Sequence, residues 1–183
     1  MLLAWGIFCW DPRKTMHRAS WIGLFRAGAF WIIRFAVRFR FGRVTQMAPK
    51  DLLAWMQDGN RQGPVLLDVR HREEYETSHL TEAKHVDPKV CVEVIRQIAD
   101  KNTPIVCYCS AGYRSSKLAN DLIVEGWQQV FNLEGSIFAW ANLGFPLEKN
   151  RRPTQEVHPY HSFFGWLIAP PNKEAKWDTT DRG

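Results

Sequence analysis

The apolar positions between residues 45 and 148 fall into two kinds of run. Short continuous runs are typical of strands buried on both faces, and apolar residues three or four positions apart are typical of helices packed on a sheet. The continuous runs predict strands over 65–69, 84–86, 105–108 and 130–133. The spaced runs predict helices over 49–58, 73–78, 89–99, 115–125 and 137–143. Because strands and helices alternate, we expect an α/β fold with a parallel sheet and helices on both of its faces.

Two segments outside this body, which spans residues 45–148, lack the alternation. Residues 1–44 form an N-terminal extension that is rich in aromatic residues and arginine. Residues 149–183 form a C-terminal tail without clear periodicity, and its last dozen residues have the composition of a disordered segment. An apolar cluster at 163–168 lies within the tail, and we expect it to pack on the body or on the extension.

The extension contains a stretch, Trp21 to Phe41, that is long enough to cross a bilayer. Its arginines make crossing unfavourable, because each one near the centre costs ~2.5 kcal/mol or more. Large apolar residues at helical spacing share one face, and the arginines gather on the other, which is typical of a helix in a membrane interface. The residues of that apolar face are Trp21, Leu24, Phe25, Trp31, Ile32, Phe35 and Phe39. The pattern is interrupted, because Phe30, Val37 and Phe41 fall among the arginines, and residues 34–41 also alternate as an edge strand does.

Three interpretations of the extension stay open. The first is a peripheral helix on an anionic membrane surface, and the second is a packing extension that covers the body or forms an oligomer. An organelle-targeting segment is less favoured, because such segments are rich in serine and this one has only Ser20. Start-site choice is a further alternative, with Met16 or Met47 as the first residue.

Charge and cysteine content narrow the class of protein. The net charge is +5, but residues 1–48 carry eight Lys/Arg against one acid, so the rest of the chain is slightly acidic and we expect no nucleic-acid partner. Four scattered cysteines do not make a disulfide framework, so a cytoplasmic location is the default, with a peripheral membrane location as its variant. No metal-ligand spacing is present, and we expect neither a metal nor another cofactor.

The loop after the strand 105–108 combines four features of an activated nucleophile. Cys109 ends the strand, Gly112 and Arg114 follow, and a helix then begins. A helix N-terminus offers unpaired N–H groups and a positive dipole, which bind anions and favour a thiolate. Gly112 allows a positive φ that turns amides inward, and Arg114 adds a permanent charge. A lone cysteine is more often a small buried hydrophobe, but this combination favours a nucleophile.

Five short motifs occur along the body: Leu-Leu-Asp-Val-Arg (66–70), Glu-Glu-Tyr (73–75), Ser-His-Leu (78–80), Tyr-Cys-Ser-Ala-Gly-Tyr-Arg-Ser (108–115) and Leu-Glu-Gly-Ser-Ile-Phe-Ala-Trp (133–140). In this order and spacing, residues 46–148 resemble a single rhodanese domain. Two positions depart from the family pattern: Thr81-Glu82-Ala83 stands where Pro-Gly-Ala is usual, and Ser136 where a second glycine is usual. Because both lie outside the cysteine loop, we expect them to affect local turns more than activity.

The resemblance implies a sulfurtransferase in which Cys109 carries sulfane sulfur as a persulfide and Arg114 stabilises it. The expected substrate-binding residues are the other members of the loop: Ser110, Ala111, Gly112, Tyr113 and Ser115. The donor would be thiosulfate or a persulfide, and the acceptor a thiol, a cyanide-like nucleophile or a protein. Related phosphatases place five residues between cysteine and arginine, and this chain places four, so we expect the loop to be too tight for a phosphate ester.

Other residues have supporting interpretations. We expect Asp68 to hydrogen-bond the loop amides; the alternative is that it is an ordinary polar residue at a strand end. We expect Arg70 either to add to the positive field of the loop or to pair with Glu73 or Glu74. Cys107 is interpreted as a core thiol in preference to a resolving cysteine.

The histidines show no nucleophile–base pattern, and His79 and His85 are interpreted as structural. The alternative to an enzyme is a non-catalytic, membrane-associated module that keeps the rhodanese fold for binding or for sensing sulfur.

Overall fold

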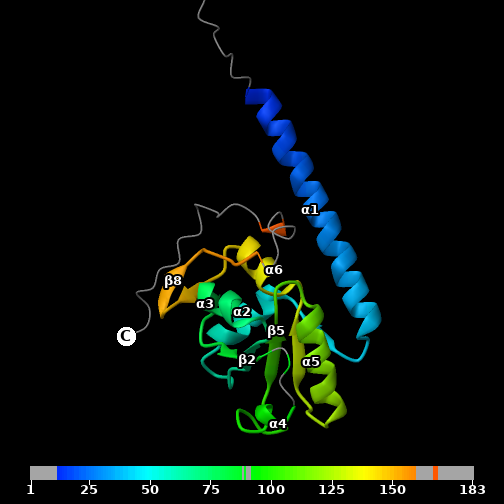
Figure 1. Ribbon diagram of the computed structural model, residues 1–183, viewed down its shortest axis with the longest axis vertical. Helices are drawn as coiled ribbons and strands as arrows, with labels where there is room; N and C mark the ends of the chain where they lie inside the picture. The colour runs from blue at the N-terminus through cyan, green and yellow to red at the C-terminus, as the bar shows by residue number, and fades with distance from the viewer. Residues whose placement is uncertain (1–11, 88, 90–91, 160–166, 169–183) are drawn as a thin grey trace, which may run out of the picture.

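The computed structural model describes residues 12–87, 89, 92–159 and 167–168, with side chains from Gly23 onward. The elements, shown in Figure 1, are α1 (Pro12–Arg40), β1 (Thr45–Met47), α2 (Pro49–Gln57), β2 (Val65–Asp68), α3 (Arg72–Thr77), β3 (His79–Leu80), β4 (Lys84–His85), α4 (Val92–Ile95), β5 (Ile105–Tyr108), α5 (Tyr113–Val124), β6 (Val130–Leu133), α6 (Ser136–Asn142), β7 (Leu147–Lys149) and β8 (Arg152–Thr154). The alternation of strands and helices predicted for the body is confirmed.

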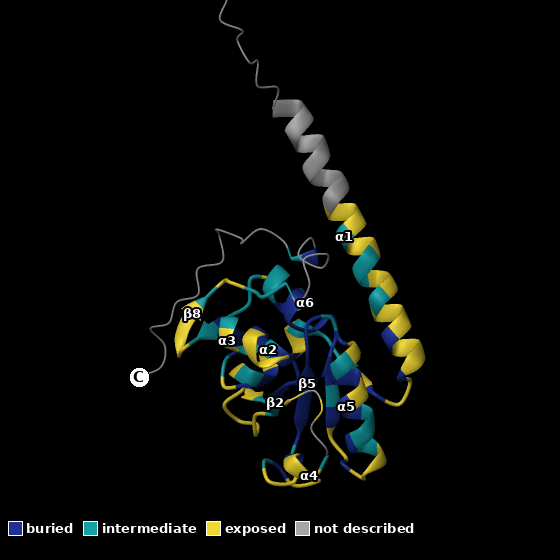
Figure 2. Cartoon of the chain, in the orientation of Figure 1, coloured by how far each residue is buried: buried dark blue, intermediate teal, exposed yellow. Residues whose placement is uncertain are grey.

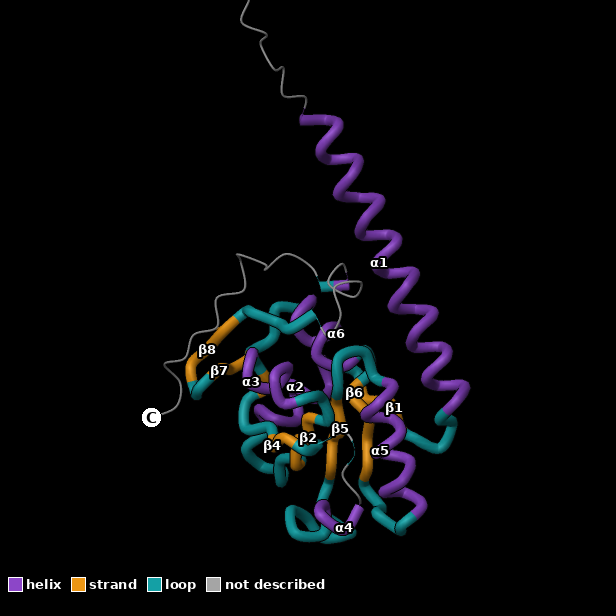
Figure 3. Tube along the Cα trace, in the orientation of Figure 1, coloured by secondary structure: helices purple, strands orange, loops and turns teal. Residues whose placement is uncertain are grey.

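The main sheet has the strand order β1-β6-β5-β2-β4, which can be followed from right to left in Figure 3. Every neighbouring pair is parallel. The strand β5 occupies the centre and is buried along its whole length. Because the strands are parallel, the carboxyl ends of β2, β5 and β6 meet at one edge of the sheet, which is where sites form in such folds.

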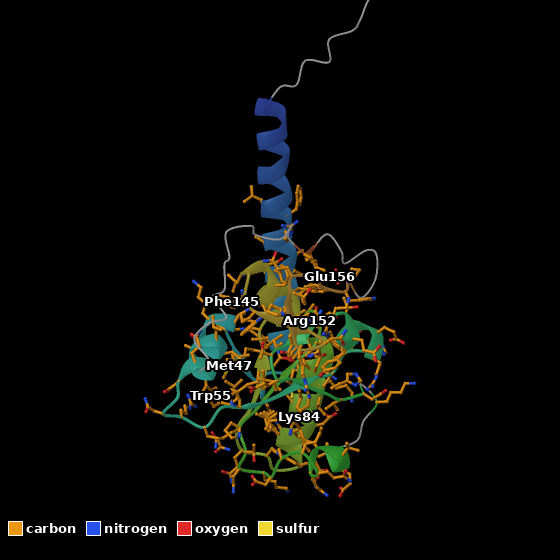
Figure 4. The ribbon with its side chains drawn as sticks, turned by 90° about the vertical axis from the view of Figure 1, so that its left-hand side faces the viewer. Met47, Trp55, Lys84, Phe145, Arg152 and Glu156 are labelled. Atoms are coloured by element: carbon orange, nitrogen blue, oxygen red, sulfur yellow. The ribbon has the colours of Figure 1, made fainter. Side chains whose placement is uncertain are left out.

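The sheet separates two hydrophobic clusters, and the helices cover both faces. On one side, Leu118 and Leu122 of α5 and Ile95 of α4 pack against alternate sheet residues such as Ile105 and Cys107. On the other side, α2 and α6 pack against the remaining sheet residues, with Leu52, Trp55, Ile137, Phe138 and Trp140 in that cluster. Figure 4 shows Met47, Trp55 and Phe145 of this second cluster on the same side of the body. The predicted sheet with helices on both faces is therefore present.

The helix predicted over 89–99 is shorter in the structure, where α4 spans only Val92–Ile95, and residues 90 and 91 lie outside the described residues. After α4 the backbone tightens, because the amides of Gln97 and Ile98 donate to the carbonyls three residues before them. Such bonds close a tighter turn than an α-helix does. The apolar spacing over 92–98 therefore marks one helical turn followed by tight turns.

A second, small sheet was not predicted from the sequence. Its strand order is β3-β7-β8, and both pairings are antiparallel. The turn between β7 and β8 consists of Asn150 and Arg151, with φ values of 51° and 60°. Positive φ at both central residues is the geometry of a tight hairpin turn. The division of body and tail at residue 148 therefore cuts through this sheet. Within the apolar cluster at 163–168, the structure describes Leu167 and Ile168, and Leu167 is fully buried in the second cluster.

Within the extension, residues 12–40 form one long helix, α1, whose second half packs on the body while its first half projects beyond it (Figure 1). Val37 of α1 and Phe41 just after it are 4% and 5% exposed and belong to the first core cluster. Phe30 packs against the second cluster. The strand alternative for residues 34–41 is wrong over 34–40, because the helix continues to Arg40. The apolar residues that interrupted the arginine face are those that contact the body.

Candidate active site

The loop after β5 places the thiol of Cys109 at the beginning of α5. Cys109 is 2% exposed and directly follows the last residue of β5. Gly112 has φ 114° and caps the N-terminus of α5, and its amide N–H donates to the Cys109 Sγ at 3.1 Å. A Cβ at this glycine would lie 3.5 Å from the amide nitrogen of Asn132, and the positive φ disfavours any other residue. Gly112 therefore turns the loop so that an amide faces the sulfur.

Buried polar side chains complete the surroundings of the sulfur. The hydroxyl of Ser115 lies 3.4 Å from the Cys109 Sγ and 2.6 Å from the side-chain oxygen of Asn132. The amide nitrogen of Asn132 in turn donates to Gln46 at 2.7 Å. Because a hydroxyl has one proton, Ser115 donates either to Asn132 or to the sulfur. The network thus places a hydroxyl donor within reach of the sulfur.

The pKa of the Cys109 thiol is lowered despite its burial. Burial alone would raise the pKa, because a thiolate is poorly solvated inside a protein. The positive charge of Arg114, the hydroxyl and amide of Ser115 and the amide of Gly112 outweigh this effect and lower the pKa below its ordinary value. Since the thiolate is the nucleophile, the loop holds an activated sulfur.

Arg114 is held in place by a buried carboxylate that the sequence analysis did not assign to the site. The two terminal nitrogens of Arg114 donate to the two oxygens of Glu74 at 3.0 and 3.1 Å, and one of them also donates to the Ser110 hydroxyl at 2.8 Å. Ser110 donates to Glu74 at 2.7 Å. Burial would raise the pKa of Glu74, but its bonds to Arg114, Ser110 and the His71 backbone lower it overall. Glu74 therefore stays ionised and partly offsets the charge of Arg114.

Ser136, which we expected to affect a local turn more than activity, lies against the nucleophile. Its hydroxyl oxygen accepts a hydrogen bond from the Cys109 backbone N–H at 3.0 Å and lies 3.9 Å from the Cys109 Sγ. The residue is fully buried and has φ 51°. The local sequence did not indicate this contact, which forms because α6 begins at the carboxyl end of β6, and this end lies beside the end of β5.

Asp68 and Arg70 form a separate buried pair. Both are fully buried, and the Asp68 carboxylate accepts bonds from the Arg70 side chain at 2.6–3.1 Å and from the Arg70 amide at 3.0 Å. Arg70 also donates to the carbonyl of Ser78. Asp68 thus bonds Arg70 and not the amides of 110–114, and Arg70 pairs with Asp68 and not with Glu73 or Glu74. A buried guanidinium needs a counter-charge, and the nearest carboxylate supplies it.

The remaining predicted residues lie around this centre. Ala111 is partly buried against the second core cluster, and Tyr113 is 57% exposed with its ring against Phe41, 5.4 Å between centroids. Cys107 is fully buried, and burial raises the pKa of its thiol far above the ordinary value, so it lacks the thiolate that a resolving cysteine needs.

The two histidines both contact a tyrosine. His79 stacks on Tyr75 at 3.9 Å between centroids, and His85 lies 5.1 Å from the same ring and bonds the Arg70 carbonyl. Their contacts are those of structural residues.

Comparisons with known proteins identify the family of the domain. A family model for the rhodanese-like domain matches residues 48–143, just over half of the chain. Thiosulfate sulfurtransferase GlpE of Pseudomonas fluorescens is 34% identical over 79 residues, which cover 43% of this chain and 72% of that protein. The tRNA uridine(34) hydroxylase of Pectobacterium atrosepticum is 29% identical over 167 residues, which cover 78% of this chain and 46% of that protein.

Among solved structures, the rhodanese-like domain of the Anabaena protein Alr3790 has a TM-score of 0.53 and 26% sequence identity. The match covers 60% of this chain and 84% of that one. The family segment contains the cysteine loop, Glu74 and Asn132, and it also contains Ser136. On this agreement of sequence and fold, the chain belongs to the rhodanese-like domain family.

Proposed function

We propose that the chain is a sulfurtransferase that carries sulfane sulfur as a persulfide on Cys109. The observation that carries the proposal is the Cys109 thiol itself: its pKa is lowered, and it accepts the Gly112 amide at 3.1 Å at the start of α5. The name of the Pseudomonas fluorescens relative, a thiosulfate sulfurtransferase, supports the same chemistry.

The reaction has two redox-neutral half-reactions. In the first, the Cys109 thiolate attacks the outer sulfur of the donor. A sulfur–sulfur bond forms at Cys109 and the donor's own sulfur–sulfur bond breaks, so its electron pair leaves with sulfite or with a thiolate. In the second, a thiolate or cyanide acceptor takes the outer sulfur, and the electron pair returns to Cys109.

The intermediate places negative charge on the outer sulfur of the persulfide, at the mouth of the loop. The N-terminus of α5 and the guanidinium of Arg114 are positive where this charge develops. The Ser115 hydroxyl can donate to the inner sulfur whenever Cys109 leaves as a thiolate. The loop therefore stabilises both the resting and the loaded state.

The ion pair between Glu74 and Arg114 favours a donor of low charge. Thiosulfate is a dianion, and an arginine whose charge is partly offset attracts it weakly, whereas a persulfide group carries one negative charge at most. We therefore propose a low-molecular-weight or protein persulfide as the preferred donor. The four-residue spacing between Cys109 and Arg114 leads us to propose that phosphate esters are not substrates, and turnover of p-nitrophenyl phosphate would contradict this.

Intact-mass measurement tests the proposal. Purified full-length chain is incubated with thiosulfate or with glutathione persulfide, beside Cys109→Ser as the control. We expect a gain of one sulfur atom that cyanide removes, that is absent from the control, and that forms faster with the persulfide. A gain that survives in Cys109→Ser would contradict the role of Cys109. No gain with either donor would favour the non-catalytic binding or sulfur-sensing module.

A further inference from the structure

Helix α1 carries two apolar faces on opposite sides. Phe30, Ile33 and Val37 contact the core clusters, and Phe41 continues their row, so that at 3.6 residues per turn the four lie within an arc of about 80°. Six other large apolar residues lie within an arc of about 120° centred on the opposite side. This second arc, called here the outer face, consists of Leu24, Phe25, Trp31, Ile32, Phe35 and Phe39.

The outer face is open to solvent. Its six side chains are 60–86% exposed, and Figure 2 shows much of the described part of α1 coloured as exposed. Trp31 and Phe35 stack on each other, 5.7 Å between centroids. Elsewhere in the described part of the chain, exposed large apolar residues such as Val94, Val124 and Leu143 belong to different elements. An apolar surface gathered on one helix marks an interaction site.

The charges beside the outer face are positive. Between residues 12 and 44 the sequence has eight Lys/Arg and no acid. Arg34 and Arg38 lie along one edge of the outer face, and both pair with the single carboxylate of Glu134, so one positive charge remains unbalanced there. Their side chains are still 48% and 58% exposed. Arg40 and Arg43, near the end of α1, are exposed as well.

These charges distinguish two occupants of the outer face. A second copy would bring the same arginines together, with no acid on either helix to pair with them, so self-association is opposed by like charges. An anionic lipid surface pairs with the arginines and takes the aromatic side chains into its interface. The body covers the first apolar face of α1. The surface of α1 that stays exposed is amphipathic, as it is in interfacial helices.

We propose that the outer face of α1 docks on an anionic lipid surface, with the helix axis parallel to it. No helix among the described residues is long and apolar enough to cross a membrane. The inner face of the same helix approaches the site, because Phe30 lies 3.8 Å from where a Cβ of Gly135 would be, and the Phe41 ring contacts Tyr113. Docking would therefore hold the cysteine loop in a fixed position beside the lipid.

Vesicle sedimentation of the full-length chain tests the proposal independently of any sulfur chemistry. The vesicles are phosphatidylcholine with and without phosphatidylglycerol. The variant Trp31→Ser/Phe35→Ser removes the stacked aromatic pair, and Phe39→Ser, at an 86% exposed position, is a second variant. The matched control is Val124→Ser/Leu143→Ser, which removes exposed apolar side chains from α5 and from the end of α6. Substitution is preferable to deletion of α1, because deletion would uncover Val37 and Phe41 of the core.

We expect the parent chain to bind the phosphatidylglycerol vesicles at least tenfold more tightly than phosphatidylcholine alone, and added salt to weaken this binding. The double variant should lose at least tenfold in partitioning, Phe39→Ser should lose a smaller part, and the control should bind like the parent. Equal binding by parent and double variant, or no binding by the parent, would overturn the proposal. A concentration-dependent dimer in light scattering that the double variant abolishes would assign the outer face to a second copy and overturn it too.

Discussion

The hydroxyl oxygen of Ser136 accepts a hydrogen bond from the backbone N–H of Cys109 at 3.0 Å, across 27 positions of the sequence. Ser136 has φ 51°, in a region that costs a residue with a side chain about 1–2 kcal/mol. Cys109 is buried, so without this hydroxyl its amide would lose its partner. The backbone of Ser136 is therefore strained, while its hydroxyl satisfies the backbone N–H of the nucleophile.

Two substitutions of Ser136 separate the hydroxyl from the strain. Ser136→Ala removes the acceptor and keeps the positive φ, so we expect the free energy of unfolding to fall by about 1–3 kcal/mol. Ser136→Gly removes the acceptor but relieves the strain, so the loss should be smaller by on the order of 1 kcal/mol. Urea denaturation of both variants measures the difference. A glycine variant less stable than the alanine variant would contradict the strain argument.

Glu74 is expected to set the charge preference of the site. Glu74→Gln removes the carboxylate that offsets the charge of Arg114, so the KM for thiosulfate should fall on the order of fivefold, with less change for a donor that presents a singly charged persulfide group. Steady-state kinetics with both donors measure this split. The neighbouring Glu73 is exposed, and Glu73→Gln is the matched control. An unchanged thiosulfate KM in Glu74→Gln would refute the assignment.

The same carboxylate predicts a pH dependence of stability. Bonds to Arg114 and Ser110 lower the pKa of Glu74 below its ordinary value of 4.5 in the folded chain. A carboxyl with a lowered folded pKa stabilises the fold above its unfolded pKa, and this stability is lost as the pH falls through the folded pKa. We therefore expect the melting temperature of the parent chain to drop more steeply below pH 4.5 than that of Glu74→Gln. Parallel curves for the two proteins would count against the ion pair.

Alkylation by iodoacetamide reports the ionisation of Cys109. We expect the rate to rise with pH with a midpoint below the ordinary value of a free cysteine, because Arg114 and the Ser115 and Gly112 donors lower the pKa of the thiol. Ser115→Ala and Arg114→Gln should each raise the midpoint. Arg96→Gln, an exposed arginine paired with Glu93 and Glu125, should not. Peptide mapping assigns the label to Cys109, and a midpoint that no loop variant moves would be inconsistent with this electrostatic account.

Local patterns predicted the sheet and the cysteine loop, because both depend on residues close together in sequence. The buried run 105–108 and the loop to Arg114 are continuous segments, and their structure follows from apolar character, a glycine and a helix start. The contacts of Glu74 with Arg114 and of Ser136 with Cys109 join residues 40 and 27 positions apart. Only the order of strands brings such residues together, and no single segment encodes it.

The packing of the extension also could not be predicted from the local sequence pattern. Its apolar residues do not form one clean face, because the helix meets the body on one side and is open on the other. A pattern with two opposite apolar faces looks irregular until the body is present. The hairpin turn at Asn150 and Arg151 was missed for a different reason, since it lacks the glycine that usually marks such turns.

Two phenylalanines two positions apart test which side of α1 packs on the body. Phe41 is 5% exposed and contacts the ring of Tyr113, whereas Phe39 is 86% exposed. Because truncation of a buried aromatic leaves a cavity, Phe41→Ala should lower the free energy of unfolding by about 3–5 kcal/mol. Phe39→Ala should change it by less than about 0.5 kcal/mol, as is usual for surface positions. Denaturation curves of the two variants measure both values. Equal effects would mean that α1 does not pack on the body through Phe41. The position of α1 beside the cysteine loop would then be wrong as well.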